Sequence, residues 1–255
     1  MRADVLSGRR AVITGASRGI GAAIAARLAQ AGAATVLIGR DKKALREQNA
    51  RIPNSQSAIC DVTDAAQVER VFAELLAQGP ADILVNNAGA AESAPIMKTS
   101  DAVLERMLSV NLGSAFRCSR AVLPAMLEQR YGRIVNIASI AGLRGYPYVT
   151  AYVAAKHALV GFTRALAMEV MQKGITVNAV CPGYTDTDLV RGAASVISAK
   201  TGRSEGDVVN EMIRTNPQGR LIRAEEIAET VAWLCGPQTD SVTGQAIAVA
   251  GGEIM

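Results

Sequence analysis

Two side chains that could exchange a proton stand four residues apart, Tyr152 and Lys156. On a helix this spacing places both side chains on one face, one turn from each other. A phenol with an ordinary pKa of about 10 is a poor base at neutral pH. A neighbouring ammonium group favours the phenolate and lowers that pKa. The pair therefore predicts a general acid–base centre in which Tyr152 gives or takes the proton.

Two further polar residues occupy positions that suit this chemistry. Ser139 follows a strand-like apolar run, residues 133–138, and its hydroxyl could bond a substrate oxygen as charge develops there. Asn111 lies inside a helical pattern, residues 100–129, where an asparagine is unfavourable without a task. Each residue alone also has a structural explanation, because a Tyr–x–x–x–Lys pair arises by chance on many helices. The four together predict a catalytic set.

A glycine-rich string near the start of the chain predicts a dinucleotide site. Thr14-Gly-Ala-Ser-Arg-Gly-Ile-Gly21 follows the first predicted strand and opens the first predicted helix. Glycines let the backbone turn tightly and approach a pyrophosphate, whose charge is stabilised at the helix N-terminus. The strand–turn–helix context makes this interpretation more specific than the glycines alone.

The end of the second predicted strand bears on the choice of cofactor. An NAD site usually has an acid here for the ribose 2′-hydroxyl, and Gly39 occupies that position. Arg40 follows it, and Arg18 projects from the glycine-rich string. Two guanidinium groups favour a 2′-phosphate, so the sequence predicts NADP(H). NAD(H) stays possible, because Arg40 could be a solvated strand-end residue and Asp41 could turn inward as the missing acid.

Short apolar runs alternate with helical patterns along the whole chain. This rhythm predicts an α/β fold, a doubly wound parallel β-sheet (Rossmann fold) with helices on both faces, as one domain over residues 1–255. The predicted strands are residues 11–14, 35–38, 57–60, 83–86, 133–138, 176–180 and 246–249. The predicted helices are residues 20–31, 65–78, 100–129, 150–172 and 224–234. Residues 184–220 break the rhythm and are predicted to be a largely irregular substrate lid.

These motifs, in this order and spacing, resemble the short-chain dehydrogenase/reductase family over essentially the whole chain. The resemblance is carried by TGASRGIG, the string Asn86-Asn87-Ala88-Gly89, Asn111, Ser139, Tyr152, Lys156 and Pro182-Gly183. It implies a Ser–Tyr–Lys triad, with Asn111 holding a water that completes a proton relay. It also implies that Lys156 bonds the nicotinamide ribose and that residues 182–187 frame the nicotinamide. Asp61 and the backbone of Val62 would meet the adenine, although Asp61 could instead cap a turn.

The expected cofactor contacts combine these motifs. They are Gly15, Ser17, Arg18, Gly19, Ile20, Gly21, Arg40, Asp61, Val62, Asn87, Ala88, Gly89, Tyr152, Lys156, Pro182, Gly183, Thr185 and Thr187.

The substrate is less well defined. The chain resembles β-ketoacyl-carrier-protein reductases, polyketide ketoreductases and short-chain hydroxyacyl-CoA dehydrogenases. This implies that a carbonyl and a secondary alcohol are interconverted, with a 3-oxoacyl or 3-hydroxyacyl thioester of carrier protein or CoA as the favoured substrate. A small ketone, alcohol or sugar is the alternative. Candidate pocket walls are Leu143, Tyr146 and Leu189; lid cations that could meet phosphates, or merely be solvated, are Arg191, Lys200, Arg203 and Arg214.

Two rival functions come from other classes. A non-catalytic scaffold that binds dinucleotide would usually have lost Tyr152 or Lys156, and both are present. An epimerase or dehydratase of the extended relatives would have a longer C-terminal part, whereas this chain ends at Met255, soon after its last predicted strand.

Composition argues against several other classes. The net charge is +4 but no run of like charge reaches five residues, which disfavours nucleic acid as a partner. No apolar stretch is long enough to span a membrane and the N-terminus has no signal-peptide core, so the cytoplasm is expected. No metal site is expected, because His157 is the only histidine and Cys60, Cys118, Cys181 and Cys235 form no C-x-x-C pair. The resemblance further implies a homotetramer built on the helices 100–129 and 150–172.

Overall fold

Parallel strands form the central sheet of the computed structural model, which describes residues 4–254 apart from the side chain of Lys200. The seven strands lie in the order β3-β2-β1-β4-β5-β6-β7, and every neighbouring pair is parallel. The sheet consists of β1 (Arg10–Thr14), β2 (Ala34–Gly39), β3 (Ser55–Ile59), β4 (Ile83–Asn86), β5 (Gly132–Ile137), β6 (Ile175–Pro182) and β7 (Ala246–Val249).

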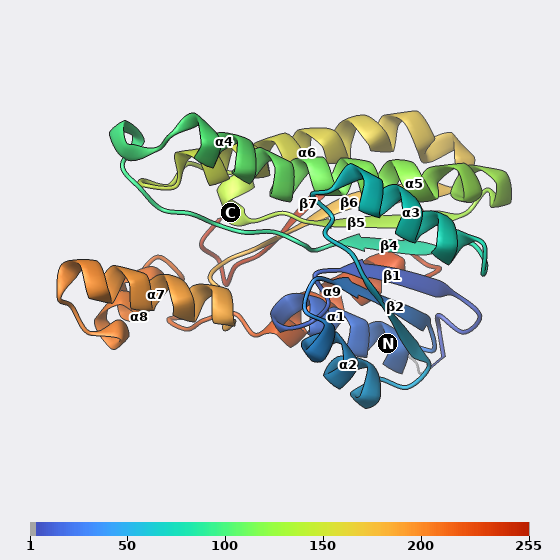
Figure 1. Ribbon diagram of the computed structural model, residues 1–255, viewed down its shortest axis with the longest axis horizontal. Coiled ribbons are helices and arrows are strands. Elements are labelled where there is room, and N and C mark those ends of the chain that lie inside the picture. Colours follow the sequence, from blue (N-terminus) through green and yellow to red (C-terminus); the bar gives the residue numbers. More distant parts are fainter. Residues whose placement is uncertain (1–3, 255) are drawn as a thin grey trace.

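Helices cover both faces of this sheet, as Figure 1 shows. One layer holds α1 (Gly19–Gln30), α2 (Lys42–Arg51) and α9 (Ala224–Cys235). The other holds α3 (Ala65–Leu76), α4 (Asp101–Leu108), α5 (Ser114–Gln129) and α6 (Thr150–Val170). The predicted doubly wound α/β architecture is confirmed. None of the helices within residues 4–254 is long and apolar enough to cross a membrane.

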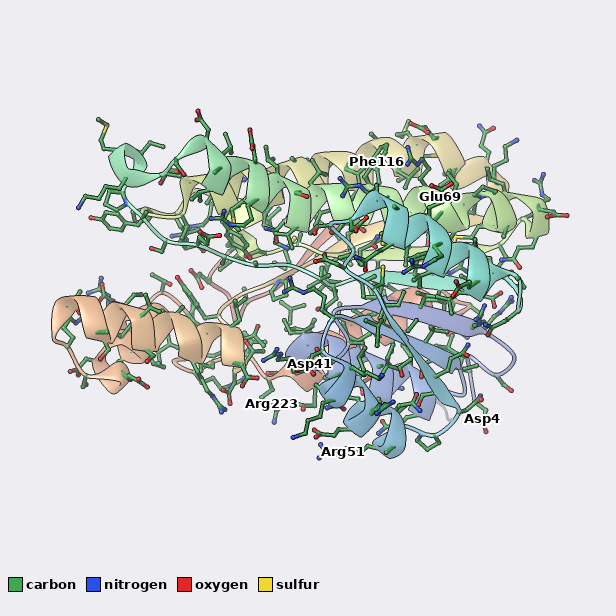
Figure 2. All side chains as sticks on the ribbon, viewed as in Figure 1. Asp4, Asp41, Arg51, Glu69, Phe116 and Arg223 are labelled. Atoms are coloured by element: carbon green, nitrogen blue, oxygen red, sulfur yellow. The ribbon has the colours of Figure 1, made fainter. Side chains whose placement is uncertain are left out.

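The edge of the sheet shows where the sequence signal was weak. The third strand covers Ser55–Ile59 rather than residues 57–60, because this edge strand is mostly solvent-accessible and has no continuous apolar run. The helix α2 was missed, since Leu45 is its only buried residue. Asp41 caps it by accepting bonds from the backbone N–H groups of Lys43 and Ala44. Figure 2 shows Asp41 and Arg51 at opposite ends of this helix.

The helical segment predicted over residues 100–129 is interrupted by one wide turn. A π-helical turn, η2 (Ser109–Gly113), joins α4 to α5. Such turns occur mostly as single bulges inside α-helices and are frequent at functional sites. This one carries Asn111.

A buried chain of polar side chains fixes α5 and α6 on the sheet. Asn86 Nδ2 donates to Ser119 Oγ at 3.1 Å and to Asn136 Oδ1 at 2.8 Å. Asn136 Nδ2 donates to Thr163 Oγ1 at 2.9 Å. Buried polar groups of this kind are costly unless they are paired, so the network specifies one position for the two helices. It thereby orients α6, the helix that carries Tyr152 and Lys156.

The predicted irregular lid is mostly helical, which corrects the sequence interpretation. It contains α7 (Asp188–Thr201) and α8 (Glu205–Ile213), which project together from the body of the molecule in Figure 1. Gly202 ends α7 in a left-handed conformation with φ of 72°, and the Ser204 side chain caps α8. Both residues are ordinary helix-end signals. The helices were missed because few of their residues are buried, so the segment has no clear apolar face.

The two ends of the lid pair with each other at its base. Thr185 and Ile222 form a parallel bridge, and Ile222 N donates to Tyr184 O at 2.8 Å. Below this base, Glu226 accepts two bonds of 2.8 Å from Arg220 and one of 2.8 Å from Arg223 N. These interactions lower the pKa of Glu226 to about 2, chiefly through the Arg220 hydrogen bond. They connect the returning lid to the start of α9.

The depressed pKa of Glu226 predicts an acid-dependent contribution to stability. The pKa is lower in the folded chain than the ordinary value of 4.5. The contribution is therefore complete above pH 4.5 and is lost as the pH falls toward about 2. We expect Glu226→Gln to lower the melting temperature by a few degrees at pH 7, and the deficit to shrink as the pH is lowered toward 3. Thermal melts across this range test it; a deficit independent of pH would contradict the assignment.

Candidate active site

The glycine-rich loop between β1 and α1 is held by the strand on its other side. Gly15 and Gly19 have φ of 65° and 56°, a region that glycine enters without strain. Asn87, just after β4, donates through Nδ2 to Thr14 O at 3.0 Å and to Gly15 O at 3.1 Å. In return, Thr14 Oγ1 accepts bonds from the backbone N–H groups of Asn87 and Ala88. The Asn87 side chain thus shapes the loop; its predicted contact with a cofactor stays a prediction.

The loop also fits tightly against the helix that it opens. A Cβ on Gly21 would overlap the Gly15 carbonyl and the Asn87 amide, so no larger residue fits there. Arg18 is the N-cap residue of α1, and its side chain cannot accept bonds from the first helical N–H groups. Those donors and the helix dipole suit a pyrophosphate. Ser17 lies in the turn before α1 and Ile20 in the first turn of that helix; their contacts with a cofactor stay predictions.

The structure brings the residues expected around the adenosine together at the ends of β2 and β3. Arg40 is exposed, and its Nη1 lies 3.7 Å from Asp61 Oδ2. Asp61 accepts bonds from the backbone and side chain of Thr63, so its carboxylate does cap a turn. The bond from the Thr63 hydroxyl is the main cause of the lowered pKa of Asp61. Val62 beside it is buried.

Asp41 does not serve as the missing acid in this structure. Its carboxylate is committed to the N-terminus of α2, where one oxygen accepts two backbone bonds at 3.1 Å and 3.0 Å. Gly39 packs against Leu45 instead of presenting a polar group. The alternative in which Asp41 turns inward therefore requires that this cap be broken.

The segment after β6 lies beside the glycine-rich loop. Gly183 N donates to Val249 O at 3.0 Å, and Thr185 Oγ1 donates to Gly183 O at 2.9 Å. Thr187 lies against the glycine-rich loop. Its methyl carbon is so near that a Cβ added to Gly19 would lie only 3.3 Å from it. Arg18 also lies near the lid, with Nη1 3.9 Å from Asp188 Oδ2. The predicted pyrophosphate and nicotinamide segments are therefore neighbours.

Ser139 and Tyr152 meet although thirteen positions separate them. Ser139 follows β5, and its Oγ accepts a bond of 3.1 Å from Ala141 N at the start of η3 (Ile140–Gly142). Burial raises the pKa of Tyr152, and a hydrogen-bonding interaction with the Ser139 side chain acts in the opposite direction. The two hydroxyls can thus act on one substrate oxygen.

Lys156 is buried below this pair. Its Nζ donates to Ile137 O at 2.9 Å and lies 5.7 Å from the centroid of the Tyr152 ring. Burial lowers the pKa of Lys156 to about 8. The pKa of the Lys156 amine therefore lies close to neutral pH.

These positions correct one detail of the sequence argument. The Lys156 amine was expected to lower the pKa of Tyr152, but in this structure the pKa of Tyr152 is raised. The physical reason is that burial disfavours the phenolate, while the amine is bonded to the Ile137 carbonyl and is itself depressed in pKa.

Asn111 connects the wide turn η2 to the segment that follows β4. Its Nδ2 donates to Ala90 O at 2.9 Å and to Met107 O at 3.0 Å. A Cβ on Gly89 would lie 2.8 Å from Asn111 Oδ1 and 3.6 Å from Lys156 Nζ. Asn111, Gly89 and Lys156 therefore meet at one point, which is the arrangement that a relay through Asn111 needs. The water itself stays a prediction.

The sequence argument missed Thr14 as a contributor to this site. Thr14 is buried at the end of β1, and its hydroxyl fixes the backbone after β4. A polar residue that ends an apolar strand and directly precedes a glycine turn was the available signal. His157 lies on the surface of α6, with Nδ1 2.9 Å from Val153 O.

Comparison with known proteins agrees with this geometry. A family profile described as Enoyl-(Acyl carrier protein) reductase matches residues 15–253. The chain is 38% identical over 250 residues to 3-oxoacyl-[acyl-carrier-protein] reductase FabG of Escherichia coli, covering 97% of this chain and 98% of that protein. It is 37% identical over 252 residues to D-beta-hydroxybutyrate dehydrogenase of Rhizobium meliloti, covering 96% and 98%.

A solved structure shares the whole fold. The crystal structure of a variant of actinorhodin polyketide ketoreductase with NADPH superposes with a TM-score of 0.93 at 36% identity, covering 99% of each chain. The resemblance found in the motifs is thereby confirmed, and the chain belongs to the short-chain dehydrogenase/reductase family of oxidoreductases.

Proposed function

We propose that this enzyme uses NADPH to reduce the 3-oxo group of an acyl thioester carried by acyl carrier protein or CoA. The observation that carries the proposal is the convergence of Ser139, Tyr152 and buried Lys156 at the carboxyl end of the sheet, beside the glycine-rich loop. Relatives named 3-oxoacyl-[acyl-carrier-protein] reductase and ketoacyl reductase support the substrate class.

Each catalytic residue has a defined part in this proposal. Ser139 donates a hydrogen bond to the carbonyl oxygen, and Tyr152 delivers its proton to that oxygen during reduction. Lys156 is held by the Ile137 carbonyl, and its amine would bond the nicotinamide ribose. Asn111 continues the relay toward solvent. When bound, the nicotinamide cofactor supplies the hydride.

The cofactor would be held by residues that follow β1, β3, β4 and β6 at the carboxyl edge of the sheet. The loop 15–21 and the N-terminus of α1 would take the pyrophosphate, and Asp61 with Val62 the adenine. Residues 87–89 and 182–187 would border the nicotinamide half, with Thr185 and Thr187 near its amide.

Preference for NADPH is supported by charge. Arg18 and Arg40 are both largely exposed, with 64% and 79% of their side-chain surface accessible. The nearest acid that could mimic an NAD site, Asp41, is engaged as a helix cap. A 2′-phosphate would offer the two guanidinium groups a better partner than the long contacts they make now.

The lid charges lend the thioester proposal little support. Arg191 pairs with Asp186 at 2.8 Å, and Arg203 pairs with Glu211. These pairs lie within the lid itself. The side chain of Lys200 lies outside the described part of the structure. A small hydroxy acid is therefore the second candidate substrate, which the likeness to D-beta-hydroxybutyrate dehydrogenase favours.

A homotetramer is also part of the proposal. The outer surface of α5 and α6 exposes Phe116, which Figure 2 shows in the outer helical layer. Its ring lies 5.7 Å from that of Phe162 on α6, and Arg120 lies over it. Apolar surface of this kind is commonly covered by another protein chain. The cytoplasm stays the predicted location.

A substrate panel tests the function. We expect NADPH-dependent turnover of acetoacetyl-CoA, followed as loss of reduced-cofactor absorbance, to exceed turnover of acetoacetate, simple ketones and sugars by at least about tenfold in kcat/KM. Preference for acetoacetate would transfer the proposal to the small hydroxy acid. No net change in cofactor absorbance with any carbonyl or alcohol would refute the enzyme interpretation.

Cofactor choice is tested at Arg40. We expect Arg40→Asp to lower the ratio of kcat/KM for NADPH to that for NADH at least about tenfold, because it removes a phosphate partner and adds repulsion. Arg51→Asp, the same change at the far end of α2 in Figure 2, is the matched control and should leave the ratio unchanged. Equal ratios in the wild type and Arg40→Asp would contradict the assignment.

The proton-transfer role is tested at Tyr152. We expect Tyr152→Phe to lower kcat at least about a hundredfold, since general acid–base catalysis contributes this much or more. Dinucleotide affinity, measured by fluorescence titration, should stay within about twofold of the wild type. Activity near the wild-type level in this variant would remove Tyr152 from the mechanism.

A further inference from the structure

The turn near the C-terminus fits closely over the segment that returns from the lid. Gly251 and Gly252 have φ of 62° and 90°. A Cβ on Gly251 would overlap the amide of Asn216, and one on Gly252 would lie 3.3 Å from Pro217 Cγ. Glycine is required here both by conformation and by this close approach. The turn therefore fixes the chain just beyond the end of α8.

Glu253, the next residue, joins two segments through one oxygen. Its Oε1 accepts a bond of 2.8 Å from the Tyr146 hydroxyl and another of 2.8 Å from the Thr215 hydroxyl. Hydroxyl bonds to a carboxylate are stronger than those between neutral groups. Tyr146 belongs to the loop before α6, and Thr215 follows α8. We call these three residues the Glu253 bridge.

Arg144 adds two contacts to the Glu253 bridge. Its Nη1 donates to the Glu253 backbone carbonyl at 3.4 Å, and its guanidinium lies 4.8 Å from the centroid of the Tyr146 ring. The same loop is thus bound to the C-terminal turn through the side chain and the backbone carbonyl of Glu253. The cation–π contact joins two side chains within the loop.

The Glu253 bridge borders the catalytic residues. Its loop runs from η3, which Ser139 caps, to α6, which carries Tyr152. On the other side, burial and then the charge of Glu253 raise the pKa of Tyr184. Tyr184 in turn contributes, after burial, to the raised pKa of Tyr152. Glu253 is therefore near enough to Tyr184, and Tyr184 to Tyr152, for each to raise the pKa of the next.

We propose that Glu253 is a positioning residue for the carbonyl substrate, because it holds the Tyr146 loop and the end of the lid at a fixed separation. This inference rests on the proposed function. Glu253 acts through Tyr146 and Thr215 rather than on the reacting atoms. Its loss therefore affects how well the substrate is bound more than proton transfer or dinucleotide binding.

Kinetics of three variants separate this role from a general structural one. Glu253→Ala removes the acceptor, whereas Glu253→Gln keeps one side-chain oxygen in place. We expect Glu253→Ala to raise KM for the carbonyl substrate about tenfold, with kcat and the Kd for NADPH within about twofold of the wild type. Glu253→Gln should recover most of the loss. Glu69→Ala is the control and should behave as wild type, because Glu69 is an exposed residue of α3, labelled in Figure 2.

Hydrogen exchange tests the same bridge without any substrate. In Glu253→Ala, amides of residues 143–149 and 186–220 should exchange faster, while those of the central strands stay unchanged. Adding Tyr146→Phe to Glu253→Ala should have little further effect on KM, because both changes remove the same hydrogen bond, the one between Tyr146 and Glu253. Should Glu253→Ala not fold, Tyr146→Phe and Thr215→Val each remove one arm and should show smaller effects of the same kind.

These outcomes test the positioning role of Glu253 separately from the proposed thioester substrate. Unchanged exchange in the two segments of folded Glu253→Ala, or an unchanged substrate KM, would overturn the positioning role. Additive effects of Glu253→Ala and Tyr146→Phe would overturn it as well. If thioesters are not substrates, the exchange data still test the bridge, and KM is then measured with the carbonyl compound that the panel identifies.

Discussion

The parallel pairing of β1 with β4 is the constraint on which the site depends. The chain builds outward from β1 through β2 and β3, then crosses back to β4 on the other side. Parallel strands place all their carboxyl ends at one edge of the sheet, and the reversal of order opens a crevice there. Thr14 and Asn87 hold the two sides of that crevice together with reciprocal hydrogen bonds. This junction helps to hold the glycine-rich loop in its shape.

Burial gives the catalytic side chains both their precision and their perturbed acidity. Lys156 is fixed because its amine is removed from water and bonded to a single carbonyl. The same desolvation lowers its pKa and raises that of Tyr152. Interactions in such an environment are stronger than in water, but an unpaired charge there is costly. In this structure burial therefore opposes the phenolate of Tyr152, and the Ser139 side chain is the group that acts in the opposite direction.

The sequence predicted an element best where its apolar residues also followed the pattern expected of a buried strand or helix face. β4 and β6 are buried along their whole length, and their apolar runs predicted them well. The helix α2 buries one residue only, so it had almost no periodic signal. The lid helices also bury few residues, and only Gly202 and Ser204 marked their ends. Propensity and capping alone are weaker guides than a buried face.

The sequence by itself determined the fold class, the family and the four candidate catalytic residues, because these follow from local spacing and from motifs in a fixed order. Tertiary structure alone decided which way the pKa of Tyr152 moves and what Glu253 touches. Glu253 bonds Tyr146 and Thr215, which lie 107 and 38 positions away. Desolvation and contacts of this range depend on segments that meet only after folding, so no local pattern encodes them.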